Sequence, residues 1–499
     1  MDRRTFLQLA AAGTAGMALP GCGGMGTRQP PPNVLFVFPD QLRANVCSIY
    51  GGHNLATPNI DRLASEGVVF TNSVSTCPLC TPYRGMLQTG RFPTHSGVLM
   101  NFVEASPAQN PHCLADVFAA AGYATGYIGK WHLAAGLHKD NPVSRGRPAC
   151  PEAAGPDHAF VPPGPQRLGY QHWQAYNFHY AYQDYWYYED EPEKRYSDLY
   201  EADTQSYQAI AFMERCRQAS RPFLLTVAPH PPHPPFTSEY TPPGYLDGVP
   251  QDVWWPPNVP AENPCTDEEM RCYLAMIRNA DDNLGRLLDY LERSGLARDT
   301  IVVFTSDHGE MLGSHGRIQK MVPYAESIDV PLVMRWPGRI VSGARVDALQ
   351  TPMDHLPTLC GLAGLPIPSE VDGVDLSRIV TREDSQSRDA VLIGQYSSAE
   401  AWFDTGTFWP EWRGVRTKQY TYVRWLAGAE ELYDNLADPY QISNLAADGA
   451  EPEALLALRG RLSDLLAAAH DDFRPGTGYN DWYDDCRILV QTALGPVPG

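Results

Sequence analysis

The sequence predicts an α/β fold, with helices covering both faces of a mostly parallel sheet, followed by a smaller C-terminal α+β domain with a short antiparallel sheet. Three observations predict it: apolar runs without alternation, helical patterns between these runs, and a change of texture after about residue 390. Strands that are buried on both faces read as continuous apolar segments. We place the main domain at 33–388 and the smaller one at 389–499.

Four apolar runs that stop abruptly at polar residues define the predicted parallel strands. They span 33–39, 122–128, 222–228 and 301–305. In an open parallel sheet, ligands bind beyond the carboxyl ends of the strands. We therefore expect the side chains that follow these runs to meet in one crevice: Asp40, Lys130, His132, His233, Asp307 and His308.

Apolar residues at a spacing of three to four predict helices over 58–66, 112–121 and 270–293. In the smaller domain, aromatic and β-branched segments at 412–417, 420–425 and 431–433 predict antiparallel strands, and a Leu-rich stripe predicts a helix over 453–470. Alternation of strands and helices up to about residue 380 is typical of a layered α/β structure.

The first 22 residues are typical of an export signal. Paired arginines, Arg3 and Arg4, precede a short Ala/Gly-rich stretch, as in a twin-arginine signal, and the residues 19–22 resemble a bacterial lipobox. Cys22 would then carry lipid, 23–32 would form a tether, and the protein would be an exported periplasmic or cell-surface lipoprotein of a bacterium. The alternative is a cleaved soluble signal in which Cys22 is incidental.

The charge balance excludes general binding to nucleic acid. Among 499 residues, 38 Lys and Arg stand against 58 Asp and Glu, a net charge of −20. An anionic substrate must therefore be held by a local cluster of positive groups. Removing Cys22 and Cys80 from the 11 cysteines leaves nine, too scattered for a dense disulfide framework, although one or two bridges are compatible with the sequence.

The most informative segment is 77–91, which contains Cys80-Thr-Pro-Tyr83-Arg84 and ends in Thr-Gly-Arg. This C-x-P-x-R pattern followed by T-G-R resembles the signature of the type I, formylglycine-dependent sulfatases of the alkaline-phosphatase-like superfamily. The segment 122–132 is similar to the second signature of that family, and further matches lie at 306–310, 354–358 and 431–445. The resemblance covers 33 to about 470 and implies hydrolysis of sulfate esters on an alkaline-phosphatase-like fold.

The resemblance also implies a set of roles. Cys80 would be oxidised to formylglycine by a maturation enzyme; one hydroxyl of its hydrate would attack sulfur, and the other would then expel sulfate. One divalent cation would be held by oxygen-rich ligands, which suits Ca²⁺ and leaves Mg²⁺ or Mn²⁺ open. The implied ligands are Asp40, Gln41, Cys80, Asp307 and His308; the implied catalytic residues are Cys80, Arg84, Lys130, His132 (base), His233 (acid) and Lys320; His230, His315 and Tyr83 are candidates for binding substrate.

Two departures from the family pattern keep other functions open. Position 41 is Gln where many members have a second Asp, which resembles the choline-sulfatase and phosphonate-monoester-hydrolase branches and favours a phosphonate or phosphate ester hydrolase as a rival. Tyr83 stands where a small residue is usual, which would narrow the pocket. A non-catalytic glycan-binding lipoprotein is the second rival. Cys77 and Cys80 also form a C-x-x-C pair, but no second C-x-x-C accompanies it.

The segment 170–188 is unusually aromatic, with ten Phe, Trp or Tyr among its 19 residues. Aromatic faces stack on sugar rings, so the segment could form glycan subsites. Packing of a long loop against the core explains the composition equally well. Trp402, Trp409 and Trp412 raise the same choice in the smaller domain. The expected substrate is therefore a sulfated small molecule or glycan.

Overall fold

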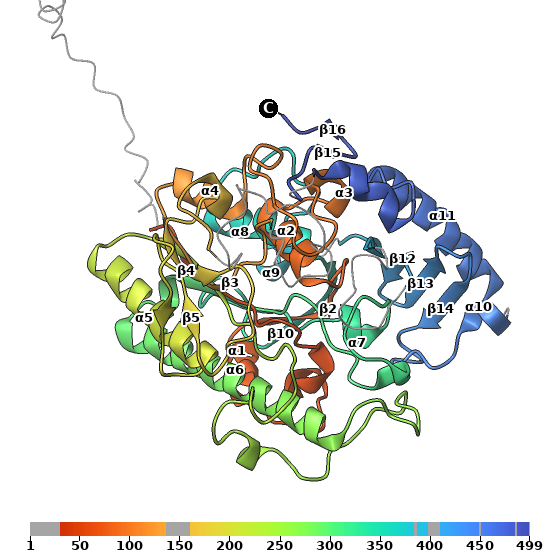
Figure 1. Ribbon diagram of the computed structural model, residues 1–499, viewed down its shortest axis with the longest axis horizontal. Helices are drawn as coiled ribbons and strands as arrows, with labels where there is room; N and C mark the ends of the chain where they lie inside the picture. Colours follow the sequence, from red (N-terminus) through yellow and green to blue (C-terminus); the bar gives the residue numbers. More distant parts are fainter. Residues whose placement is uncertain are drawn as a thin grey trace, which may run out of the picture. The chain divides into compact units, whose positions relative to one another are not determined.

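An eight-stranded sheet forms the centre of the computed structural model, which describes residues 30–135, 160–383, 387–397, 410–448, 451–484 and 487–498 (Figure 1). All neighbouring strands pair in parallel except β9, which runs antiparallel to β2 and β8. In spatial order the strands are β10 (Ala344–Gln350), β2 (Val68–Ser73), β9 (Val333–Arg335), β8 (Thr300–Phe304), β1 (Asn33–Val37), β7 (Phe223–Ala228), β3 (Ala124–Lys130) and β4 (His172–Tyr176). The predicted fold class is confirmed.

Helices cover both faces of this sheet, and each face has its own buried apolar cluster. One face carries α1 (Pro58–Ser65), α5 (Glu201–Gln218) and α6 (Asp267–Ser294). The other carries α2 (Cys80–Thr89), α4 (Leu114–Ala120), α8 (His355–Ala363) and α9 (Ser377–Val380). Figure 1 shows α1 and α6 on one side of the strands and α2 and α8 on the other. The predicted helices over 58–66, 112–121 and 270–293 correspond to α1, α4 and α6.

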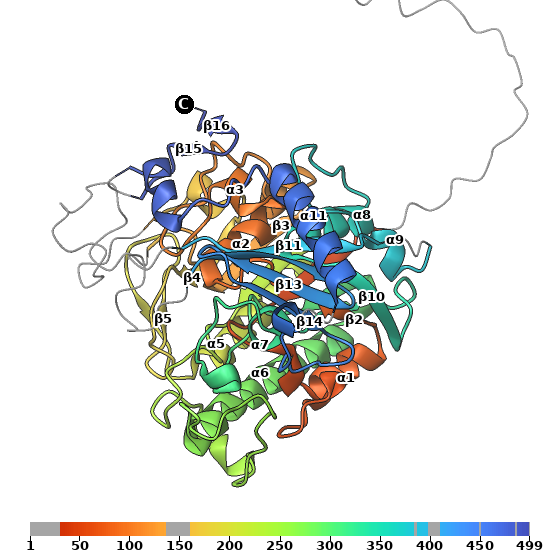
Figure 2. The ribbon, with the colours of Figure 1, turned by 90° about the vertical axis from the view of Figure 1, so that its right-hand side faces the viewer.

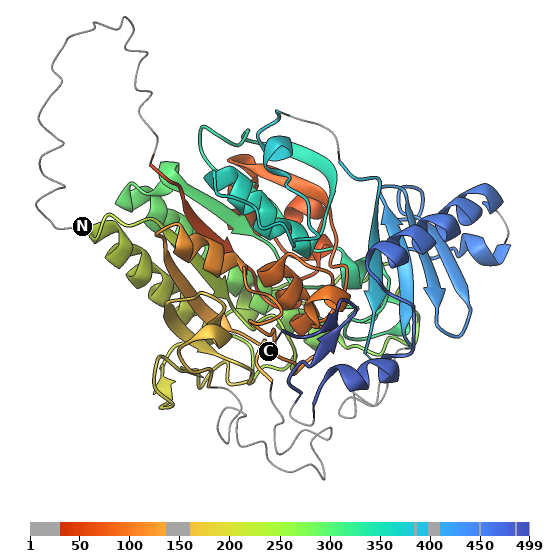
Figure 3. The same cartoon turned by 90° about the horizontal axis from the view of Figure 1, so that it is seen from above.

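The C-terminal segment builds a second, antiparallel sheet in the order β11 (Ala390–Gln395), β12 (Trp412–Thr417), β13 (Tyr420–Trp425) and β14 (Glu430–Asp434). The helix α11 (Pro452–Ala468) lies across it and buries Leu458 and Leu462 against it (Figure 2). Figure 3 shows this blue segment gathered at one side of the larger sheet. The boundary between residues 388 and 389 stays a prediction, because the chain from Pro32 onward forms one compact unit.

The remaining α-helices and β-strands of the described residues are short. They are α3 (Pro93–Ser96), α7 (Ala325–Ile328), α10 (Leu445–Asp448) and the paired strands β5 (Trp186–Tyr187) with β6 (Arg195–Tyr196) and β15 (Gln491–Thr492) with β16 (Gly495–Pro496). Within the described ranges, no helix has the length and apolar character needed to cross a bilayer. The predicted export signal, Cys22, Trp402 and Trp409 lie outside the described residues.

The cysteines that the structure describes are all free thiols, so the bridges that the sequence left open are not found among them. The eight are Cys47, Cys77, Cys80, Cys113, Cys216, Cys265, Cys272 and Cys360.

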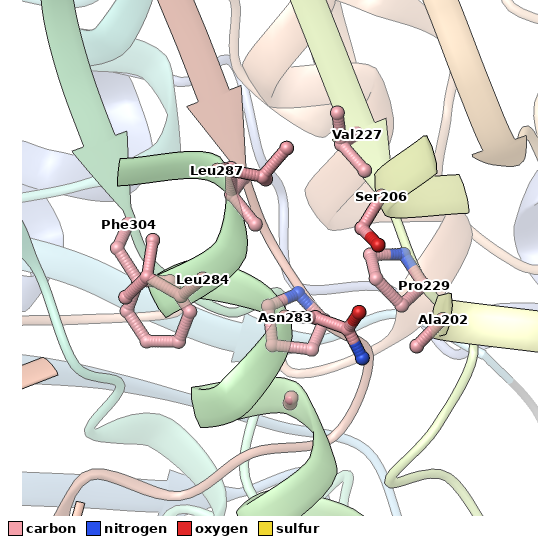
Figure 4. Close-up of a pocket in the computed structure, with 11 residues that line it drawn as sticks. Ala202, Ser206, Val227, Pro229, Asn283, Leu284, Leu287 and Phe304 are labelled. Carbon is pink, nitrogen blue, oxygen red and sulfur yellow. The ribbon is translucent and has the colours of Figure 1, made fainter. Parts of the chain in front are cut away.

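A small pocket lies beside the carboxyl ends of β1, β7 and β8, on the face covered by α5 and α6 (Figure 4). Its walls are mainly apolar, with Ser206 and Asn283 as polar members. None of the site residues predicted from the sequence lines it. The pocket is therefore a gap in the packing behind the strand ends.

Helix α2 is buried along its whole length, and one glycine allows its close packing. A Cβ atom at Gly85 would lie 2.7 Å from Cβ and Cγ1 of Val98. Since Cys80 and Arg84 belong to the same helix, this contact also fixes the position of the predicted nucleophile segment.

We predict that Gly85→Ala lowers the free energy of unfolding by about 1–3 kcal/mol, because the added methyl group overpacks the contact with Val98. Gly460 in the middle of α11 is the matched control, since a Cβ there meets nothing within 4 Å. Gly460→Ala should raise the stability by about 0.5–1 kcal/mol through helix propensity. Chemical denaturation measures both, and an unaffected Gly85→Ala protein would contradict the packing argument.

Candidate active site

Four buried side chains with metal-binding atoms meet beyond the carboxyl ends of β1 and β8. These atoms, from Asp40, Cys80, Asp307 and His308, lie within 4.8 Å of one another. Sγ of Cys80 is 3.2 Å from Nε2 of His308 and 3.7 Å from Oδ1 of Asp40. The structure thus brings together, in one cluster, residues separated by more than 200 positions in the sequence.

The register of two neighbouring strands places the carboxylates side by side. Val37 on β1 pairs with Phe304 on β8, and Asp40 and Asp307 each follow three residues later. The chain then turns sharply at Gln41, whose φ is 69° and whose N–H donates to Oδ1 of Asp307 at 2.9 Å. Parallel strands that end in the same register therefore present the two carboxylates to the same space.

The electrostatics of the two carboxylates show that they fit a cation. Burial opposes the ionisation of Asp40, but Lys130, followed by His233, His308 and Arg84, holds its pKa well below the ordinary value. Burial and the negative charge of Asp40 raise the pKa of Asp307. A positive ion between the two would relieve this repulsion. Two carboxylates and an imidazole form a donor set suited to a divalent metal.

Three basic side chains surround the carboxylates. Nη2 of Arg84 donates to Oδ2 of Asp40 at 3.1 Å and to Oδ2 of Asp307 at 3.2 Å. Nζ of Lys130, the last residue of β3, donates to Oδ2 of Asp40 at 2.6 Å. Nζ of Lys320 donates to Oε1 of Gln41 at 2.5 Å. The site therefore combines buried carboxylates with three basic side chains.

Three of the predicted histidines lie at the same edge and are neutral near pH 7. Burial lowers the pKa of His132, His230 and His233 well below the ordinary value, and nearby lysines lower it further. Neither ring nitrogen of His132 has a hydrogen-bond partner among the described residues. Nε2 of His233 lies 3.0 Å from Nζ of Lys320, while its Nδ1 lies 2.9 Å from the carbonyl oxygen of Pro234. With Lys320 as donor, Nδ1 carries the proton of His233.

Tyr83 and His315 are placed differently from the other candidates. Tyr83 is buried in the core on the α2 side, where its ring stacks on Phe38 and its hydroxyl lies 3.5 Å from Nε2 of His355. His315 stacks on Tyr324 with ring centroids 3.9 Å apart. The contacts described for these two side chains do not join them to the carboxylate cluster, and their binding of substrate stays a prediction.

Two aromatic side chains of the 170–188 segment reach the site, although most of that segment packs internally. The ring of Phe178 lies 4.8 Å from that of His132 and 5.0 Å from Nζ of Lys130. Tyr180 stacks on His230 at 5.5 Å and remains 43% exposed. The sequence identified the aromatic segment, but it did not predict which of its residues would lie at the site and which would be buried. The buried ones include Tyr176, Tyr182, Tyr185 and Tyr188.

Glu201, the first residue of α5, was missed by the sequence analysis. Its Oε1 accepts hydrogen bonds from the hydroxyl of Tyr176 at 2.5 Å, from Nε2 of Gln205 at 2.8 Å and from the N–H of His230 at 2.9 Å. Burial raises its pKa to about 7, although these hydrogen bonds oppose the shift. Glu201 therefore anchors the loop that carries His230 and His233. A single acidic residue at the start of a helix gives no sequence signal for such a role.

Comparison with known proteins agrees with the geometry. The family model "Sulfatase" matches residues 32–365, and the model "N-sulphoglucosamine sulphohydrolase, C-terminal" matches 313–468. An ulvan-active sulfatase of Formosa agariphila is 34% identical, covering 91% of this chain and 84% of that protein. An endo-4-O-sulfatase of Bacteroides thetaiotaomicron is 32% identical over 84% of this chain and 88% of that protein. A solved structure from Bacteroides thetaiotaomicron, from work on its metabolism of multiple glycosaminoglycans, is 28% identical with a TM-score of 0.77, covering 90% of this chain and 98% of the other.

We predict that Glu201 makes the stability fall as the pH rises. Between the ordinary pKa of 4.5 and about 7, the unfolded chain releases the proton that the folded protein keeps, so the free energy of unfolding decreases through this window and is flat outside it. Glu201→Gln keeps an accepting oxygen but cannot titrate. From pH 5 to 8 the wild type should lose about 2–3 kcal/mol relative to the variant in chemical denaturation. Parallel pH profiles would contradict this assignment.

Proposed function

The chain belongs to the sulfatase family of sulfuric ester hydrolases, and from this premise we propose that it cleaves sulfate monoesters of a carbohydrate at the Cys80 cluster. The observation that carries the proposal is the position of Cys80. This residue begins α2, and its side chain lies against Asp40 and His308, with Arg84 one helical turn away. An ordinary buried cysteine would lie among apolar side chains instead.

We propose that Cys80 acts as formylglycine and that Asp40, Gln41, Asp307 and His308 hold one divalent ion, Ca²⁺ being the first candidate and Mg²⁺ or Mn²⁺ the others. Formylglycine would supply a hydrated aldehyde as the nucleophile, and the ion would supply positive charge beside it. The repulsion between Asp40 and Asp307 supports this ligand set. The modification requires a separate maturation enzyme as a partner.

The basic side chains bind the anionic group in this proposal. Lys130 is the last residue of β3, and Lys320 lies in the segment between β8 and α7. Each carries a primary ammonium group that can donate to sulfuryl oxygens. Arg84 is already engaged with both carboxylates, so its role is to offset their charge and hold them in place. The whole-protein charge of −20 repels anions, which makes this local cluster necessary.

Two histidines move protons in the proposed reaction. His132 is neutral and has two ring nitrogens without described partners, which suits a base. His233 and Lys320 form a pair through Nε2 and Nζ, 3.0 Å apart. We propose that His233, paired with Lys320, donates the proton to the leaving alcohol. A bound anion would offset the positive charge of the lysines that lowers the pKa of His233, so that His233 could gain this proton. His230 remains the second candidate for this step.

Phe178 and Tyr180 support a carbohydrate as the substrate. Both rings lie beside catalytic histidine candidates, and Tyr180 combines this position with an exposed surface. Sugar rings stack on such faces. Relatives named for ulvan and for an endo-acting 4-O-sulfatase agree with a sulfated glycan.

Hydrolysis of a phosphonate or phosphate ester is the second candidate. Gln41 favours it, because an amide in place of a second Asp removes one negative charge and resembles the pattern of the phosphonate-monoester-hydrolase branch. We further propose that the export signal and Cys22 lipid direct the mature protein to the periplasm or cell surface, a proposal that rests on residues 1–22 of the sequence.

We predict that the protein from its native host cleaves aryl sulfates with a higher kcat/KM than aryl phosphonates. Its Cys80 peptide should react with an aldehyde-specific probe. Cys80→Ala should lower kcat by roughly 10³-fold or more, as expected for loss of a nucleophile, with an unchanged circular dichroism spectrum. A preference for phosphonate would favour the second candidate, and an intact Cys80 thiol in active protein would refute both.

We predict that Tyr180→Ala raises KM for a sulfated oligosaccharide about 3- to 10-fold through loss of ring stacking, while kcat/KM for a small aryl sulfate changes little. Tyr207 on α5, 52% exposed, is the matched control for loss of an exposed aromatic ring. Steady-state kinetics on both substrates measure the effect. Equal losses on the two substrates would show that Tyr180 supports the site and not the sugar.

A further inference from the structure

Gln41 is the neutral member of the proposed ligand set, and its neighbours fix the orientation of its amide. Nε2 of Gln41 donates to Oε2 of Glu310, and Oε1 accepts from Nζ of Lys320 at 2.5 Å. A carboxylate only accepts hydrogen bonds and an ammonium group only donates them. Of the two amide orientations, only the observed one satisfies both neighbours. Glu310 and Lys320 therefore decide which atom of the Gln41 amide is the oxygen, and this oxygen accepts from Lys320 on the side opposite to Glu310's hydrogen bond.

Glu310 is itself held firmly. It is 1% exposed, and its Oε1 accepts hydrogen bonds from the N–H of Gln319 at 2.6 Å and from the N–H of Leu312 at 2.9 Å. Nη1 of Arg43 donates to the carbonyl oxygen of Glu310 at 3.3 Å. Because Gln319 precedes Lys320, the same carboxylate also fixes the backbone next to the lysine.

We propose that Glu310 is a positioning residue that turns the oxygen of Gln41 toward the cation and makes an amide, instead of a carboxylate, the required side chain at position 41. This inference rests on the proposed function for the identity of the site. A carboxylate at 41 would lie against that of Glu310 in a buried environment, where like charges repel strongly. Gln at position 41 is neutral and can donate a hydrogen bond to Glu310, which a carboxylate at this position could not do.

A positioning role for Glu310 predicts a change in cation affinity opposite to the one expected from net charge alone. Gln41→Glu, which keeps the length of the side chain, adds a negative charge to a cation site, and by charge alone it should bind a divalent ion more tightly. If Glu310 governs position 41, the new carboxylate is repelled and the affinity falls. Glu310→Gln should restore it in the double variant, because an amide at 310 can donate to a carboxylate at 41. The pair therefore exchanges the two side-chain types while keeping their hydrogen bond.

The test measures the dissociation constant for Ca²⁺ by competition with a fluorescent chelator, using full-length metal-stripped protein and its Gln41→Glu, Glu310→Gln and double variants. We expect Gln41→Glu to weaken binding at least tenfold, Glu310→Gln to weaken it several-fold because the amide of Gln41 can then flip, and the double variant to return within threefold of the wild type. Equal or tighter binding by Gln41→Glu, or no recovery in the double variant, would overturn the proposal, as would a wild type that binds no Ca²⁺.

Glu326→Gln is the matched control. Glu326 is also a buried glutamate, and its Oε1 accepts from a side-chain amide, Nδ2 of Asn258, at 2.7 Å. Its loss should change the Ca²⁺ affinity less than twofold, and a loss as large as that of Glu310→Gln would mean that any buried charge has this effect and would overturn the proposal. Circular dichroism confirms that each variant is folded. Since Ca²⁺ binding is measured without turnover, the effect of these variants can be interpreted even if the protein shows no sulfatase activity.

Discussion

The burial of two carboxylates side by side is the constraint on which the rest of the site depends. Asp40 and Asp307 are both fully buried, and the shared register of β1 and β8 places them side by side. Isolated buried charges are costly, so each needs charged or hydrogen-bonding partners. Arg84 and Lys130 supply part of this compensation through direct ion pairs. Burial and the negative charge of Asp40 nevertheless raise the pKa of Asp307, against the lowering effect of His308, Arg84 and Lys130.

Helix α2 brings Cys80 to this charge cluster. Cys80 is its first residue, so the N-terminal end of the helix dipole adds a partial positive charge near the thiol. Burial and Asp40 act to raise the pKa of Cys80, yet Lys130, Lys320 and His308 bring it below the ordinary value. By contrast, burial raises the pKa of Cys77, only three residues earlier, to about 12. The difference between these two thiols comes from the neighbouring charges and not from depth in the protein.

Sequence patterns predicted four of the eight strands of the main sheet, because these four are apolar runs that end at ionisable residues, and they missed β2, β4, β9 and β10. They predicted β1, β3, β7 and β8, and the structure brings together the residues that follow these strands. They missed α5, whose buried side chains include Glu201, Thr204, Gln205, Ser206 and Gln208, so that it shows no apolar stripe. The position of Tyr83 in the core and the contact between Gln41 and Glu310 also could not be predicted from the sequence. Both depend on tertiary contacts: α2 turns Tyr83 toward Phe38, and the left-handed backbone at Gln41 turns the amide toward Glu310. Periodicity carries no information about either.

The protonation of the histidines follows from the same balance of charge. Nearby lysines and burial keep His132 and His233 neutral when the site holds no anion. A neutral His132 is ready to accept a proton, whereas a neutral His233 must first gain one before it can donate to an alcohol. An anionic ester bound between Lys130 and Lys320 would offset the lysine charges that His233 feels, and it would therefore raise the proton affinity of this residue at the moment when an acid is needed. The charge of the substrate would thus select the protonation state that the reaction requires, and a neutral ligand of the same shape would leave the pair inactive.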